Sequence, residues 1–303
     1  MTIEVSKTEY GRSVAGVNLA VFFWGITPVF VKASDATSSA ILAYRLLLTT
    51  PVAFWFFFRE GSRINRKIMT VAIVPALFFY ISTGSGYAAF QQTSIANAML
   101  ISQLAPVIVL FAAPIMFKET LDPRRVMLAV TALGGAVLVV LGGGKTGNAS
   151  IQGDLWAVSN CITWAIYFLM VKRQRDLGAK LWGFLAPVMF WTTIFAFIGP
   201  LFLNQSLAVG SAFNWLMVLS VGFLSMTAHA LLTWAQRNME ATYTSLLMLG
   251  MPIISAISAY VVFREKLSAL QFLGGFIVVT SLALVTLVSS RLNRSIARVP
   301  DPA

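Results

Sequence analysis

His229 is the only histidine in the chain, and it lies inside a long apolar stretch of sequence. Polar and ionisable side chains are costly inside a membrane and are often functional there. The imidazole could donate a hydrogen bond to a substrate carboxylate, transfer a proton, or make a structural hydrogen bond between helices. A shift of 146 residues pairs His229 with Thr83, which is also polar, and this pairing favours a position beside a cavity.

Other residues with suitable chemistry surround these two positions at helical spacing. They are Tyr80 and Tyr87 beside Thr83, Met226 beside His229, Met99 with Gln103 on a further segment, and the paired Trp24 and Trp164. Gln103 can both donate and accept hydrogen bonds, so it could bind both ends of a zwitterion. A Trp ring attracts an ammonium group by roughly 0.5–2 kcal/mol and stacks on aromatic rings. We predict that these residues contact substrate, with packing against lipid or helices as the alternative for each aromatic ring.

Two prolines, Pro106 and Pro252, lie in the middle of predicted helices and are also related by a shift of 146. Proline lacks an N–H, so the carbonyls of Ser102 and Met248 lose their helical partners. Transporters tolerate such breaks where a cavity or hinge exists. We expect the two prolines to be hinges of a conformational change, with a static kink as the alternative.

Arg45 is the only full charge inside a predicted helix. It could bind a substrate carboxylate, but the favoured interpretation is an ion pair with Asp35 or Glu265, or a contact with a carbonyl. All eleven Asp and Glu residues fall in loops or at helix ends. We therefore expect a cavity without a fixed net charge. Catalysis needs an acid, a base and a nucleophile together, so an enzyme is not expected, and no metal or cofactor is predicted.

The elements that must position these residues are membrane helices. The chain is 58% hydrophobic and 11% charged, against about 25% charged residues in soluble domains. The fold class expected is therefore all-α and integral to the membrane. Ten apolar segments predict transmembrane helices at 14–33, 38–58, 68–90, 94–117, 124–142, 153–171, 181–203, 213–235, 242–263 and 268–290.

The ten segments form two copies of a five-segment unit, 14–142 and 153–290. WGITPVFVK (24–32) aligns with WAIYFLMVK (164–172), and FKETL (117–121) aligns with FREKL (263–267). Because each unit crosses the membrane an odd number of times, the second must enter from the opposite face. Inverted repeats of this kind are typical of secondary transporters, which bind substrate between the halves.

Basic residues predict the orientation. Of the 22 Lys and Arg residues, 17 fall on one side of the predicted helices, with both termini, and four on the other. The side richer in Lys and Arg is cytoplasmic. Since these residues lie in short loops, the net charge of +11 indicates membrane orientation and not nucleic-acid binding.

With these motifs, Arg45 within LAYRLLL, and a proline before both FKETL and FREKL, the sequence resembles the drug/metabolite transporter superfamily. Within it, the likeness is to the EamA-type ten-helix exporters, over about residues 14–290. The resemblance implies a basket of ten helices around a central cavity, lined by the first, third, fourth, sixth, eighth and ninth. One departure is that the first helix holds Trp24 and no acid, which puts proton antiport through a buried carboxylate in doubt.

The resemblance is strongest to exporters of aromatic and neutral amino acids in the bacterial inner membrane. The expected function is therefore export of such amino acids by alternating access, driven by the substrate gradient or by protons. The alternatives are an exporter of cationic drugs or other metabolites, and more remotely an integral membrane enzyme. The expected partners are the small-molecule substrate and the lipid bilayer, and the sequence is compatible with a monomer.

Overall fold

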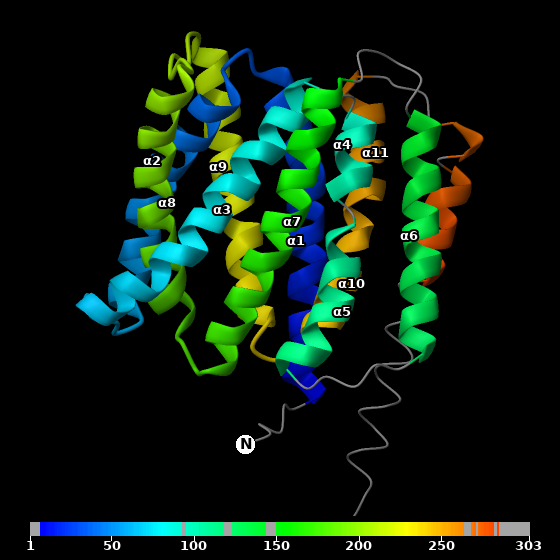
Figure 1. Cartoon of the computed structure of the whole chain (residues 1–303), viewed down its shortest axis with the longest axis horizontal. Helices are drawn as coiled ribbons and strands as arrows, with labels where there is room; N and C mark the ends of the chain where they lie inside the picture. The colour runs from blue at the N-terminus through cyan, green and yellow to red at the C-terminus, as the bar shows by residue number, and fades with distance from the viewer. Residues whose placement is uncertain are drawn as a thin grey trace, which may run out of the picture.

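The computed structural model describes residues 7–92, 95–102, 104–117, 123–143, 150–263, 268–270, 272–281 and 284. This part of the chain is helical and contains no β-strand (Figure 1). The helices are α1 (Lys7–Ala33), α2 (Ser38–Arg59), α3 (Arg66–Gln92), α4 (Ile95–Ser102), α5 (Ala105–Phe117) and α6 (Pro123–Gly143). They continue with α7 (Ile151–Asp176), α8 (Leu181–Leu203), α9 (Ala212–Ala235), α10 (Ala241–Leu247), the 3₁₀ turn η1 (Met248–Gly250) and α11 (Met251–Phe263). Residues 272–281 form a further apolar helical segment.

Seven helical stretches within the described residues are long and apolar enough to cross a membrane. Their outer faces carry large apolar side chains, such as Phe202 at 83% exposed and Phe223 at 67% exposed. Such a surface would be unfavourable in water and suits the hydrocarbon core of a bilayer. The protein is therefore a multi-pass membrane protein.

Local sequence signals set where the helices begin. Thr37, Ser150 and Ser211 precede α2, α7 and α9, and each side chain accepts a hydrogen bond from a backbone N–H in the first turn. These caps satisfy N–H groups that have no helical partner. The largest extensions beyond the predicted segments are in α1, which begins at Lys7, and in α7, which continues to Asp176. Their polar ends continue the helix beyond the apolar stretch.

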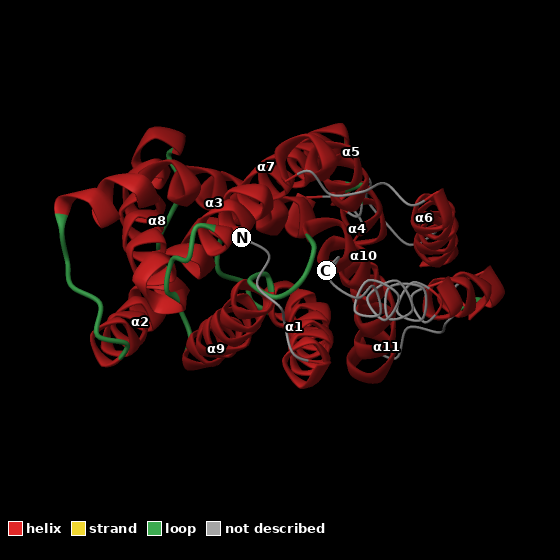
Figure 2. Ribbon diagram, turned by 90° about the horizontal axis from the view of Figure 1, so that it is seen from below, coloured by secondary structure: helices red, strands yellow, loops and turns green. Residues whose placement is uncertain are grey.

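The helices form two rows when seen along their axes (Figure 2). One row holds α2, α9, α1 and α11, the other holds α8, α3, α7 and α5, and α6 lies at one end. Helix α3 packs along α7, and α9 packs along α1. Helix α2 bridges the rows by packing against α8. Segments far apart in the sequence therefore enclose the centre of the molecule.

The predicted helices 94–117 and 242–263 are each interrupted, which the sequence indicated only as bends. Pro106 is the second residue of α5, and Pro252 is the second residue of α11. Proline suits the first turn of a helix, where an N–H is not needed, so a new helix starts at each one. In the second break the carbonyl of Met248 accepts a hydrogen bond from the N–H of Met251, which replaces the helical bond that proline cannot make.

Candidate functional site

A cavity of about 160 Å³ lies between the two rows of helices. Its wall combines aromatic, methionine, hydroxyl and amide side chains from α1, α2, α3, α7 and α9, with contributions from the broken helices. Seven of the predicted site residues line it: Trp24, Thr83, Tyr87, Met99, Trp164, Met226 and His229. Seven of the nine predicted contact residues therefore share one continuous surface.

One predicted residue, Tyr80, is not found on this wall. Tyr80 lies against α8, where any side chain at position 199 in place of Gly199 would collide with the tyrosine hydroxyl. Its ring centroid is 6.3 Å from that of Phe195, also on α8. Gln103 lies outside the described residues.

The aromatic side of the cavity is built around Trp24 and Trp164. Their ring centroids are 5.3 Å apart and their planes are at 89°, the edge-to-face arrangement that aromatic pairs favour. Corresponding positions in the two halves thus meet directly. A flat or aromatic ligand group in the cavity would contact these rings.

His229 is buried beside this pair, with its ring centroid 6.1 Å from that of Trp24. Its Nε2 is hydrogen-bonded to the hydroxyl of Tyr167 on α7. The alternative role of His229, a structural hydrogen bond between helices, is therefore available, and its partner is Tyr167. Sequence reasoning missed Tyr167, although it lies one helical turn after Trp164 and is fully buried.

A second polar group on the wall is centred on Asn160 of α7. Its Nδ2 donates to the carbonyl of Ser82 on α3 at 2.7 Å, and its Oδ1 accepts from the hydroxyl of Ser102 on α4 at 2.8 Å. One amide therefore joins three helices at the point where α4 ends. Asn160 was not among the predicted residues, although an amide inside an apolar segment is a signal of interhelical bonding.

Arg45 lines the cavity and is 4% exposed, contrary to the expectation of a wall without fixed charge. Its guanidinium carbon lies 5.2 Å from the centroid of the Tyr87 ring and 6.0 Å from that of Phe79. The expected ion pair with Asp35 does not form, since Asp35 is exposed, and Glu265 lies outside the described residues. Among the described residues, no Asp or Glu lines the cavity, and no cluster of His, Cys, Asp or Glu could hold a metal ion.

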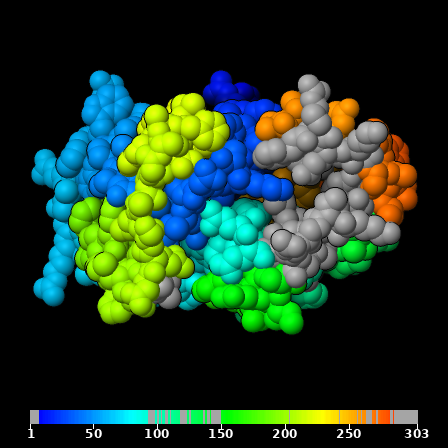
Figure 3. Space-filling view, turned by 90° about the horizontal axis from the view of Figure 1, so that it is seen from above, coloured from blue at the N-terminus to red at the C-terminus, as the bar shows by residue number. Residues whose placement is uncertain are grey.

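Polar contacts tie the helix ends together on the face opposite the N-terminus. The segment between α8 and α9 lies against the start of α2 on this face (Figure 3). The hydroxyl of Thr37 donates to the carbonyl of Ser206 at 2.6 Å, and Ser39 is hydrogen-bonded to Gln205.

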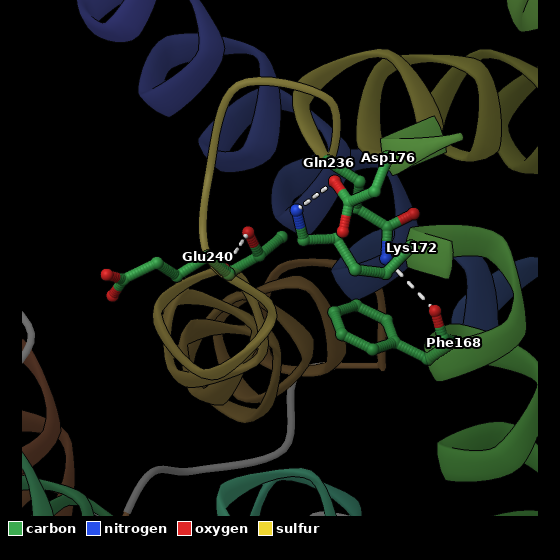
Figure 4. Close-up of polar contacts among 6 residues, drawn as sticks. Phe168, Lys172, Asp176, Gln236 and Glu240 are labelled. Carbon is green, nitrogen blue, oxygen red and sulfur yellow. Dashed lines mark hydrogen bonds and ion pairs between the residues drawn. The ribbon is translucent and has the colours of Figure 1, made fainter. Parts of the chain in front are cut away.

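The N-terminal face has its own polar layer, beyond the buried Phe168 of the cavity wall (Figure 4). The side chain of Gln236 donates to the carbonyl of Phe168 at 3.3 Å. One turn further along α7, Lys172 and Asp176 form an ion pair at 2.5 Å. The central cavity is thus bracketed by polar contacts near both membrane faces.

A multi-pass helical membrane protein with a polar and aromatic cavity between packed helices has the form of a transporter. The sequence matches the EamA-like transporter family over residues 12–141 and again over residues 151–287. The chain therefore belongs to the EamA-like transporter family, and it is a membrane transporter.

Individual relatives have similar names. An uncharacterized transporter of Archaeoglobus fulgidus is 21% identical over 91% of this chain and 96% of its own length. The uncharacterized transporter YxxF of Bacillus subtilis is 26% identical over 73% of this chain and 71% of its own. A solved structure described as "Crystal structure of protein" has the same fold, with a TM-score of 0.75 over 91% of this chain and 98% of its own, at 17% identity.

Proposed function

We propose that this protein exports neutral and aromatic amino acids across a bacterial inner membrane. The observation that carries the proposal is the perpendicular Trp24–Trp164 pair on the wall of a cavity that also holds hydroxyl and amide groups. Such a wall suits a small zwitterion with an apolar or aromatic side chain. Trp24, Thr83, Tyr87, Met99, Trp164, Met226 and His229 are the proposed contacts, and Gln103 stays a prediction.

The proposed architecture is ten crossings in two inverted halves, 14–142 and 153–290, with both termini in the cytoplasm. The packing of α3 on α7 matches that of α9 on α1, as a two-fold relation between the halves requires. The three crossings beyond the seven long spans would be α4 with α5, α6, and the segment after residue 268. The Lys and Arg distribution supports the orientation.

The proposed mechanism is alternating access, in which the cavity opens to one face and then to the other. The helix breaks before Pro106 and Pro252 supply one flexible point in each half. Each break lies beside the cavity, because Met99 and Ser102 of α4, and Met248 and Met251 around η1, line its wall. Bending at these points would change the wall and the opening together.

Export of cationic drugs is a weaker candidate. A cation-binding cavity needs an acid, and the described wall carries Arg45 and no carboxylate. The fixed positive charge would repel a cationic ligand in a medium of low dielectric.

Efflux of labelled Trp, Phe, Met and Lys from proteoliposomes, with and without a pH gradient, tests the proposal. The neutral species should leave the vesicles and Lys should not. Efflux that is independent of the gradient indicates facilitated transport, and efflux only under the gradient makes His229 the candidate for proton coupling. If none of the amino acids leaves the vesicles, the amino-acid proposal is rejected.

A tryptophan variant links the efflux to the cavity. Trp24→Leu should weaken the apparent affinity for aromatic substrates about 2- to 30-fold, from roughly 0.5–2 kcal/mol of ring interaction. Trp55→Leu is the matched control, because Trp55 on α2 is 51% exposed on the outer surface. Equal effects of the two substitutions would contradict a substrate role for Trp24.

A further inference from the structure

Arg45 is a buried cation without a carboxylate partner in the described part of the chain. It is 4% exposed, and its Nε–H has no hydrogen-bond partner. In the cavity its guanidinium lies over the rings of Tyr87 and Phe79, and the faces of these rings attract a cation. The guanidinium is thus only partly satisfied.

An arginine cannot escape this situation by losing its proton, because guanidinium stays charged in proteins. An uncompensated buried charge costs several kcal/mol, and intramembrane arginines face cavities or partners for this reason. Here the side chain faces a cavity that a ligand can enter. The missing partner is therefore expected to be part of the ligand.

We propose that Arg45 binds the carboxylate of the transported substrate, and that the substrate class is small molecules with a free carboxylate and an apolar body. This inference rests on the proposed transport function and adds which end of the substrate is recognised. A guanidinium can bind a carboxylate through two parallel N–H bonds, one of them from Nε. The class includes zwitterionic amino acids and aromatic monocarboxylates, and it excludes amines that lack the acid group.

The residues around Arg45 would orient the bound substrate in the cavity. The ring of Phe79 lies 6.0 Å from the guanidinium carbon of Arg45 and 4.6 Å, centroid to centroid, from the ring of His229. Beyond His229 lies the Trp24–Trp164 pair. A carboxylate on Arg45 would therefore direct the apolar body of the substrate along Phe79 towards the two tryptophans.

The backbone of Arg45 is held firmly, which prepares the site for binding. Its carbonyl accepts a hydrogen bond from the hydroxyl of Thr49 at 2.8 Å. On the neighbouring helix α9, a Cβ added at Gly222 would lie 3.4 Å from the Cβ of Arg45. The two helices meet closely here, so little ordering is needed when a ligand arrives.

Binding to the purified protein in detergent tests the inference, with ligand-induced thermal stabilisation as the readout. The probes are 3-phenylpropionate, phenylalanine, phenylalaninamide and phenethylamine, which share one aromatic body and differ in their charged groups. The two probes with a carboxylate, 3-phenylpropionate and phenylalanine, should bind about 10- to 100-fold more tightly than phenylalaninamide and phenethylamine, which lack it. Hydrogen bonds to a charged group contribute at that level. Equal affinities of the acid and the amide for the unaltered protein would overturn the inference without any variant.

Variants then assign the preference to one side chain. Arg45→Gln should remove the preference for the acid, and Arg45→Lys should keep part of it, because lysine retains the charge but not the paired N–H groups. Arg59→Gln is the matched control, since Arg59 is on the same helix but is exposed and stacks on Trp55. An Arg45→Gln variant that folds and still prefers the acid would overturn the inference.

The outcomes also separate this inference from the proposed function. If 3-phenylpropionate binds through Arg45 while no amino acid binds or is transported, the carboxylate site stands and the amino-acid proposal fails. If Arg45→Gln exports phenylalanine with unaltered affinity and rate, the carboxylate site fails and the amino-acid proposal stands.

Discussion

Helices α2 and α8 occupy corresponding places in the two halves of the sequence, but they bury opposite kinds of side chain. A shift of 140 residues pairs Arg45 of α2 with Leu185 of α8. Both side chains are buried, at 4% and 0% exposed. Arg45 faces the cavity, whereas Leu185 belongs to an apolar cluster that includes Ala53 and Phe57.

The same contrast appears elsewhere between the halves. The shift of 140 pairs Asn160 with Ala20, which is fully buried and has no polar side chain. The tryptophans and the two prolines, by contrast, are present in both halves. The tryptophans and the helix breaks are shared, while Arg45 and Asn160 have apolar counterparts in the other half. A cavity built in this way can bind a molecule with two different ends in one direction.

Placing a charge in α8 at the position that corresponds to Arg45 should have the largest effect on stability. Leu185→Arg places a charge in a packed apolar cluster without a partner or a cavity, so we expect a loss of at least about 3 kcal/mol of stability. The yield of monodisperse protein and its melting temperature measure this. Leu177→Arg is the control, because Leu177 is 73% exposed just after α7. An unchanged melting temperature for Leu185→Arg would mean that α8 tolerates charge as α2 does.

Removing the amide of Asn160 should have the next largest effect. Asn160→Ala removes the hydrogen bonds that this amide makes to the carbonyl of Ser82 and the hydroxyl of Ser102, which costs about 1–3 kcal/mol. Thr163→Ala is the matched control on α7, since the Thr163 hydroxyl donates to carbonyls of its own helix. Thermal unfolding of both variants in detergent compares them, and similar losses would remove the special role of Asn160.

The pairing of His229 with Tyr167 separates a structural role from a substrate role. Tyr167→Phe removes the hydroxyl that His229 contacts and keeps the aromatic ring, so stability should fall by about 1–2 kcal/mol. His229→Ala should do the same and also change which amino acids are exported. Efflux competition among Trp, Phe and Met measures the second effect. If both variants lose stability and neither alters selectivity, His229 is structural only.

Replacing the proline at either helix break should slow transport modestly and to the same extent. Pro106→Ala and Pro252→Ala restore one backbone N–H each, and a hydrogen bond of about 1 kcal/mol that favours one conformation slows exchange about fivefold. Expression and thermal stability should change little. Initial efflux rates of both variants give the comparison. Unchanged rates in both would reject the hinge proposal, and a change in only one would show that the halves move differently.

Helix positions could be predicted well from the sequence because lipid imposes long apolar runs. The predicted segment 38–58 became α2 at Ser38–Arg59, and 181–203 became α8 with the same bounds. The contact between Trp24 and Trp164 also involves residues that correspond in the repeat of the amino-acid sequence. These features depend on local composition and on repetition, which a sequence carries directly.

The structure differs from the expectations where the arrangement of neighbouring helices decides the contact. Tyr80 and Tyr87 share one helical face about 10 Å apart along the axis, at 1.5 Å per residue. Helix α3 runs obliquely (Figure 1), so this face meets α8 at Tyr80 and the cavity at Tyr87. For Arg45 the sequence offered acids as partners but no distances to them. Both cases depend on tilt and depth, which periodicity does not encode.

The buried charge of Arg45 also bears on ions that are not substrates. A protein that opens a cavity to one side of a membrane and then to the other can leak H⁺ or Na⁺. Each such ion would dissipate about 2.3 kcal/mol at a membrane potential of 100 mV. A guanidinium in the pathway repels small cations, as positive groups do in pores that exclude protons. The Arg45 side chain would thus also limit the leakage of H⁺ and Na⁺ that would weaken the ion gradients of the cell.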